Sequence, residues 1–130
     1  MLEKGMKAEM TKTVTDEDVR MFAKVSSDTN PVHLDEEYAK KSMFGRRIAH
    51  GMISAGYISA VLGNKLPGNG SIYLGQTLKF MKPVYLNDTI TTVVEIIDVN
   101  EERHIYTLKT DCINQRGEVV TTGEAKIMKK

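Results

Sequence analysis

The sequence is poor in the features of secreted and nucleic-acid-binding proteins. Its 130 residues include a single cysteine, Cys112, so no internal disulfide bond can form. The 18 basic and 17 acidic residues leave a formal net charge of +1, which provides no broad basic surface for a polyanion. We therefore expect a reduced, cytoplasmic setting and no nucleic-acid partner.

Long hydrophobic runs are also missing. The most apolar window, residues 48–62, is interrupted by polar side chains such as His50, and it is shorter than the about 20 apolar residues that cross a bilayer. The N-terminus carries no uninterrupted apolar stretch of the signal-peptide type. The sequence therefore predicts no membrane partner.

Motifs for metals and nucleotides are scarce as well. Cys and His do not cluster at metal-ligand spacing, and neither Gly-x-Gly-x-x-Gly nor Gly-x-Ser-x-Gly occurs. We therefore predict neither a metal site nor a cofactor.

The residues that are present predict one α+β domain over residues 1–130. Residues 6–14 have strand-like composition, and Thr15 stands as an N-cap before three acidic residues that favour the start of a helix. Asp35 can cap a short helix over residues 36–40. In residues 51–62, large apolar side chains recur at helical spacing among small residues, which indicates a buried central helix that other backbone approaches closely on several sides.

The second half of the chain predicts an antiparallel sheet. Residues 72–80 alternate between apolar and polar side chains and read as one strand, bounded by Pro83. Further strand patterns with short connections follow at residues 88–99, 103–113 and 118–128. About five strands and one long helix make an α+β fold in which the sheet curls around the helix.

The segment Asp28-Thr29-Asn30-Pro31-Val32-His33 is the most informative for function. It places an acid and an imidazole five positions apart around an Asn-Pro turn, since Pro31 biases Asn30 away from the α region. This spacing suits two groups that converge on one water. Taken singly, Asp28 could simply turn the chain and His33 could be an ordinary loop histidine. Their combination with the downstream His50-Gly51-Met52 favours a functional pair.

The tripeptide His50-Gly51-Met52 lies where the predicted central helix begins. Unpaired N–H groups and the positive end of the helix dipole favour a developing oxyanion at such a place. Gly51 could equally just allow the helix to start against neighbouring backbone. A histidine at a helix start, such as His50, is typically a cap or a packed neighbour.

Residues 27–37, Ala39 and residues 47–52 resemble, nearly residue for residue, the signature of the MaoC-like R-specific enoyl-CoA hydratases. The resemblance runs from the helix before Asp28 to residues 122–125 and is most specific at residues 27–56. Ser27 departs from it, because many members carry Gly or Glu there. The resemblance implies a hotdog fold, an acyl-CoA thioester substrate and a homodimer. It also implies that Asp28 and His33 are the catalytic pair and that the amide of Gly51 polarises the thioester carbonyl.

Further substrate-binding residues are predicted around this pair. They are Asn30, Pro31, His50, Ser54, Gly75 and Gln76. Gly75 and Gln76 belong to a strand that resembles the one after the central helix in polyhydroxyalkanoate-linked hydratases, although a plain core strand would look the same. The nearest basic residues, which could meet the phosphates of coenzyme A, are Arg46, Arg47, Lys79 and Lys82. A solvated surface charge is the more common role for any one of them.

The reaction implied is the reversible hydration of trans-2-enoyl-CoA to (R)-3-hydroxyacyl-CoA. Attack of water on C3 puts negative charge on the thioester oxygen, so the site needs a donor there and acid–base groups at the water. Which of Asp28 and His33 is the base stays open, and we expect the pair to be closed to bulk water. Alternatives are a dehydratase for carrier-protein-bound chains, a hotdog thioesterase, which generally lacks D-x-N-P-x-H, and a non-catalytic acyl-CoA-binding subunit.

Overall fold

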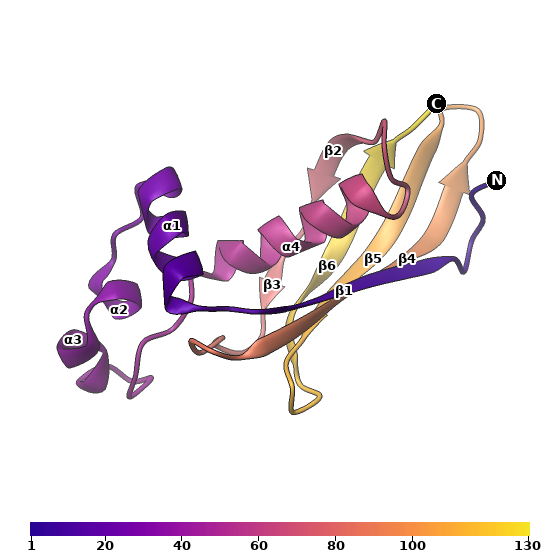
Figure 1. Cartoon of the computed structure of the whole chain (residues 1–130). Coiled ribbons are helices and arrows are strands. Elements are labelled where there is room, and N and C mark those ends of the chain that lie inside the picture. The colour runs from indigo at the N-terminus through magenta and orange to yellow at the C-terminus, as the bar shows by residue number, and fades with distance from the viewer.

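An antiparallel sheet curves around one long helix in this protein (Figure 1). The structure is a computed structural model that describes residues 1–130. Its strands are β1 (Lys7–Thr13), β2 (Ile72–Gln76), β3 (Lys79–Phe80), β4 (Thr89–Asn100), β5 (Ile105–Ile113) and β6 (Val119–Met128). The strand order is β1-β4-β5-β6-β2, and β3 also pairs with β6. The predicted α+β architecture is confirmed, with six strands in place of about five.

The sixth strand arises because the predicted strand 72–80 is broken at Thr77. The backbone of Gly123 in β6 passes so close that a Cβ added there would lie 1.8 Å from the carbonyl oxygen of Thr77. Thr77 forms hydrogen bonds with both backbone groups of Glu124. Its N–H donates to the Glu124 carbonyl at 2.9 Å, and its hydroxyl accepts from the Glu124 N–H at 3.0 Å. Regular pairing stops there and resumes at β3.

Three short helices, α1 (Asp16–Ser26), α2 (Pro31–Leu34) and α3 (Glu36–Lys40), gather beyond one end of the sheet (Figure 1). Thr15 caps α1 as predicted: its hydroxyl accepts from the Asp18 N–H at 3.1 Å, and the Asp18 carboxylate accepts from the Thr15 N–H. Asp35 caps α3 through the Tyr38 N–H. The caps that the sequence predicts therefore fix where these helices begin.

Helix α2 differs from the loop that the sequence suggested. Asn30 has φ of −52° and ψ of 126°, outside the α region that a following proline disfavours, and its side chain accepts from the Val32 N–H at 3.2 Å. Pro31 then occupies the first helical position, where its missing N–H costs nothing. The Asn-Pro step therefore starts a helical turn that carries His33.

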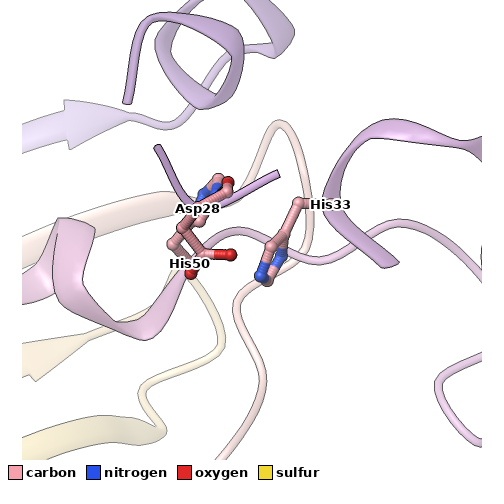
Figure 2. A group of neighbouring side chains, drawn as sticks. All are labelled: Asp28, His33 and His50. Atoms are coloured by element: carbon pink, nitrogen blue, oxygen red, sulfur yellow. The ribbon is translucent and has the colours of Figure 1, made fainter. Parts of the chain in front are cut away.

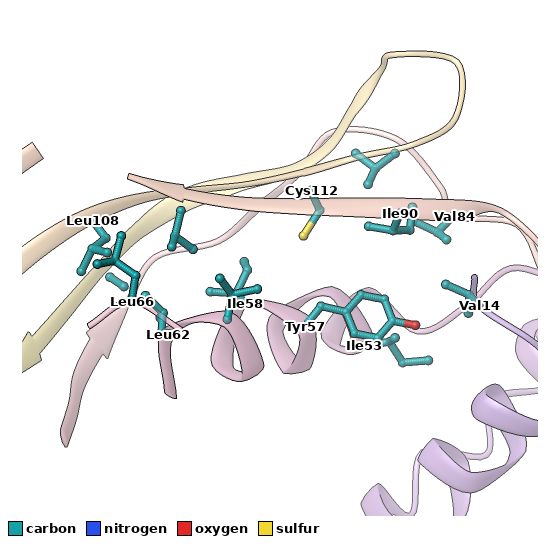
Figure 3. Close-up of a cluster of buried hydrophobic side chains, with 14 of the residues drawn as sticks. Val14, Ile53, Tyr57, Ile58, Leu62, Leu66, Val84, Ile90, Leu108 and Cys112 are labelled. Atoms are coloured by element: carbon teal, nitrogen blue, oxygen red, sulfur yellow. The ribbon is translucent and has the colours of Figure 1, made fainter. Parts of the chain in front are cut away.

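The central helix α4 (Gly51–Asn64) packs one face on the sheet (Figure 3). Its buried side chains are Ile53, Ser54, Tyr57, Ile58, Val61 and Leu62. They join strand residues such as Val94, Leu108 and Ile127, each no more than 1% exposed, in a single core. The expectation of close approach on several sides is wrong for the single chain, because the face with Met52, Gly56 and Ser59 is exposed. None of the helices has the length and apolar character needed to cross a membrane.

Candidate active site

Three side chains meet where the short helices adjoin the start of α4 (Figure 2). They belong to Asp28, in the loop after α1, to His33, on α2, and to His50, directly before α4. One ligating atom from each lies within 4.8 Å of the other two. The structure therefore brings the predicted pair together and adds His50 to it.

Asp28 is held through its backbone and one carboxylate oxygen. Ser27, with φ of 68°, ends α1 in the left-handed region, and the Asp28 N–H donates to the Ser26 hydroxyl at 3.1 Å. Its Oδ1 accepts from the Asn30 N–H at 3.3 Å, and its carbonyl accepts from His50 Nε2 at 2.9 Å. Oδ2 has no partner. The residue is exposed in the single chain, so the expected closure against bulk water is wrong at this level of assembly.

His33 is buried, and its tautomer is fixed by one hydrogen bond. Its Nδ1 lies 2.8 Å from the carbonyl oxygen of Ile48, and a carbonyl can only accept, so Nδ1 carries the proton and Nε2 has a free lone pair. Burial lowers the pKa of His33 below its usual value of 6.5. His50 and Arg47 lower this pKa further, and the Ile48 carbonyl and Asp28 oppose the shift. A neutral imidazole with a bare nitrogen is the form that accepts a proton.

His50 packs against this imidazole. The two rings stack with their centroids 3.8 Å apart and their planes inclined by 28°. The centroid of the Phe22 ring lies 4.8 Å from that of His50. His50 is 3% exposed and makes no side-chain cap bond to α4. Of the two roles that the sequence suggested for His50, a helix cap or a packed neighbour, the structure shows the second. Its contact with both Asp28 and His33 was not predicted.

Asp28, His33 and His50 could in principle offer ligands to a metal ion. The two imidazoles are nearly parallel and stacked, so their in-plane lone pairs do not converge on one ion at the about 2.1 Å that zinc requires. The arrangement fits an acid–base pair better than a closed metal site.

A cavity of about 450 Å³ opens beside the start of α4. Gly51, Met52 and Ser54 from the helix line it together with apolar residues such as Phe80 of β3. No backbone acceptor pairs with the Gly51 and Met52 amides. A Cβ at Gly51 would lie 2.9 Å from Phe80 Cε1, so the close approach of this ring favours glycine here. The helix start thus presents unpaired N–H groups beside an apolar hollow.

Gly75 and Gln76 lie elsewhere in the single chain. They line a second hollow of about 420 Å³, which adjoins the first only through Met52. The side chain of Gln76 is tied into the sheet, because Nε2 donates to the Thr110 hydroxyl at 3.0 Å and Oε1 accepts from the Tyr73 hydroxyl. The structure does not bring these two residues to Asp28 and His33.

The basic residues near the site are mostly engaged. The Arg47 side chain is 10% exposed, pairs with Asp16 at 2.6 Å and donates to the His33 carbonyl at 2.7 Å. Arg46 stacks over the ring of Tyr85, and Lys82 pairs with Glu118 at 2.9 Å. The prediction that Arg47 could meet a phosphate is wrong, because this guanidinium braces the helix that carries His33.

The sheet wrapped around α4, with an acid–imidazole pair at the helix start, defines a hotdog-fold protein of the hydratase and dehydratase class. The sequence pattern of the MaoC like domain matches residues 1–116, and the chain belongs to this family.

Similar proteins agree with this assignment. An (R)-specific enoyl-CoA hydratase of Rhodospirillum rubrum is 46% identical over 98% of this chain and 88% of its own length. The solved structure of the (R)-hydratase from Aeromonas caviae involved in PHA biosynthesis superposes with a TM-score of 0.97 at 43% identity, covering 99% of this chain and 98% of that one. A mitochondrial 3-hydroxyacyl-[acyl-carrier-protein] dehydratase of Arabidopsis thaliana is 35% identical over 96% of this chain and 76% of its length.

The lowered pKa of His33 predicts the acid side of the pH profile. If the neutral imidazole is the active form, kcat/KM falls as the pH drops through a pKa below 6.5. The free energy of unfolding falls over the same window, because the unfolded chain binds a proton at His33 before the folded chain does. Initial rates measure kcat/KM, and denaturation curves measure the free energy of unfolding, each between about pH 5 and pH 9. A rate that stays flat over this range would contradict a titrating pair.

Proposed function

We propose that this chain is an R-specific 2-enoyl-CoA hydratase that adds water to trans-2-enoyl-CoA and also catalyses the reverse dehydration. The observation that carries the proposal is the bare Nε2 of His33 beside the carboxylate of Asp28, next to the unpaired amides at the start of α4. The relatives named as (R)-specific hydratases support the substrate and the stereochemistry.

In the proposed mechanism the pair acts on one water. His33 Nε2 takes a proton from the water as its oxygen bonds to C3, and the unpaired Oδ2 of Asp28 accepts from the other hydrogen and orients the water. The Gly51 N–H donates to the thioester oxygen, where negative charge develops. The imidazolium of His33 then returns its proton to C2. Hydroxide at C3 and hydrogen at C2 account for the water.

We propose supporting roles for the other predicted residues. Asn30 and Pro31 shape the loop: the Asn30 N–H donates to the Asp28 carboxylate, and both residues start α2. Ser54 lines the cavity beside Gly51 and would face the acyl part of the substrate. That cavity is mainly apolar, which suits an acyl chain better than a phosphate.

A homodimer is part of the proposal. Strand β2 is an edge of the sheet, and its Ile72, Tyr73 and Leu74 side chains are 56%, 41% and 47% exposed. An exposed apolar edge favours pairing with a second copy, which would also cover the open face of α4. In such a dimer, Gly75 and Gln76 of one chain could contact substrate bound at the Asp28–His33 site of the other chain. Sedimentation as a monomer would contradict the dimer.

A cytoplasmic setting stays a prediction from the single cysteine.

Carrier-protein-bound substrates are the second candidate, because the Arabidopsis relative is named for them. The test compares kcat/KM for crotonyl-CoA and for crotonyl-carrier protein, with the product read by R-specific and S-specific dehydrogenases. We expect faster hydration of the CoA ester and only the R product. A preference for the carrier-bound chain would replace the proposed substrate, and failure with both would favour a non-catalytic binding subunit.

A further inference from the structure

We infer that His50 is a positioning residue, which holds Asp28 and His33 in fixed geometry relative to the start of α4 (Figure 2). The inference rests on the proposed function, and it assigns His50 no contact with the reacting atoms.

The first observation is the bond from His50 to the Asp28 backbone. Nε2 lies 2.9 Å from the Asp28 carbonyl oxygen, which can only accept, so Nε2 carries the proton. The bond spans 22 positions of the sequence and fixes the loop whose side chain would orient the water. The Asp28 loop has only local bonds besides this one, to Ser26 and Asn30. His50 is therefore its tie to the rest of the site.

The second observation is the other nitrogen of the same ring. His50 Nδ1 is buried and has no hydrogen-bond partner. A buried polar atom without a partner is unfavourable, so an apolar side chain would serve better if packing were the whole role. A histidine is nevertheless favoured at this position if its Nε2 donor is needed for the bond to the Asp28 carbonyl. In that case the unpaired Nδ1 is the consequence of having a ring that can donate at Nε2.

The third observation is the stack with His33. His33 is hydrogen-bonded at Nδ1 only, and a ring held at one atom can still rock about that bond. The His50 ring, 3.8 Å away and inclined by 28°, restricts the plane in which His33 Nε2 points. Because His50 directly precedes Gly51 in the chain, the pair is also held at a constant offset from the Gly51 amide.

Two substitutions separate positioning from packing. In His50→Gln the amide nitrogen can reach the place of imidazole Nε2 and donate to the Asp28 carbonyl, whereas in His50→Asn the side chain is one bond too short. We expect the Asn variant to lose about 10²-fold in kcat for crotonyl-CoA hydration, with KM changed by less than about threefold. The Gln variant should recover about a tenth or more of the wild-type kcat. Both variants should unfold at similar temperatures.

A second readout needs no substrate. In wild-type protein the imidazole ¹⁵N and ¹H signals should show His33 protonated at Nδ1 with slow proton exchange. We expect both variants to broaden this signal, because neither side chain replaces the ring that stacks on His33, while only the Gln variant restores the bond to the Asp28 carbonyl.

The outcomes distinguish the two proposals. Wild-type protein that hydrates no enoyl thioester would overturn the proposed function, while the NMR comparison would still decide the positioning role. An Asn variant with wild-type kcat and an unchanged His33 signal would overturn the positioning role alone. Equal losses in both variants that follow only the folded fraction would show that His50 acts by packing.

Discussion

Replacing Asp28 with asparagine is expected to lower kcat for enoyl-CoA hydration by about 10³-fold. The substitution is nearly isosteric, so Oδ1 can still accept from the Asn30 N–H and the loop should keep its shape. The negative charge is lost, and the unpaired position gains an N–H donor where an acceptor would orient the water. The decrease in enoyl-thioester absorbance on adding enzyme measures the rate.

Asp98→Asn provides the matched control. Asp98 is an exposed carboxylate on β4, outside the site, so the same chemical change there should leave kcat unaltered. An Asp28→Asn enzyme with kcat close to that of wild type would remove the carboxylate from the mechanism. An equal loss in the two variants would point to a general effect of charge.

The second large effect concerns stability: Gly123→Ala should lower the free energy of unfolding by about 3 kcal/mol. The new Cβ would lie 1.8 Å from the Thr77 carbonyl oxygen and 2.7 Å from its carbon, and both are backbone atoms that cannot rotate away. The chain must separate there, which strains the two hydrogen bonds between Thr77 and Glu124. Urea denaturation measures the change.

Gly63→Ala is the control for this substitution. A Cβ at Gly63 meets nothing within 4 Å, and alanine is favoured over glycine in a helix, so stability should stay the same or rise by up to about 1 kcal/mol. Wild-type stability in Gly123→Ala would show that the crossing at Thr77 is looser than the structure describes. Activity should also fall in Gly123→Ala, because β3 carries the Phe80 ring that packs on Gly51.

Local sequence patterns predicted the elements whose determinants lie close together in the chain. The caps at Thr15 and Asp35 and the strand patterns of β4, β5 and β6 depend on neighbours a few residues away, and the structure has these elements close to where the sequence indicated. The hotdog arrangement came from the family resemblance, whereas the pairing of Asp28 with His33 was indicated by their spacing and by that resemblance together.

The features that escaped prediction depend on distant contacts. The break between β2 and β3 depends on the close approach of Gly123, which lies far along the chain, and the sequence of residues 72–80 does not predict it. Helix α2 requires the Asn30 side chain to turn back on Val32, which a turn-forming Asn-Pro step does not reveal. The stack of His50 on His33 exists only once α2 and α4 are side by side. The exposure of Asp28 likewise reflects tertiary placement rather than local sequence.

The joint action of Asp28 and His33 on one water is tested most directly by a double-mutant cycle. The rate of loss of crotonyl-CoA absorbance is measured for wild type, Asp28→Asn, His33→Gln and the double variant. Residues that act as a unit are strongly non-additive, so we expect turnover by the wild type and similar large losses in all three variants, within about tenfold of one another. Losses that multiply in the double variant would show two independent groups, and no turnover by the wild type on this substrate would contradict the account.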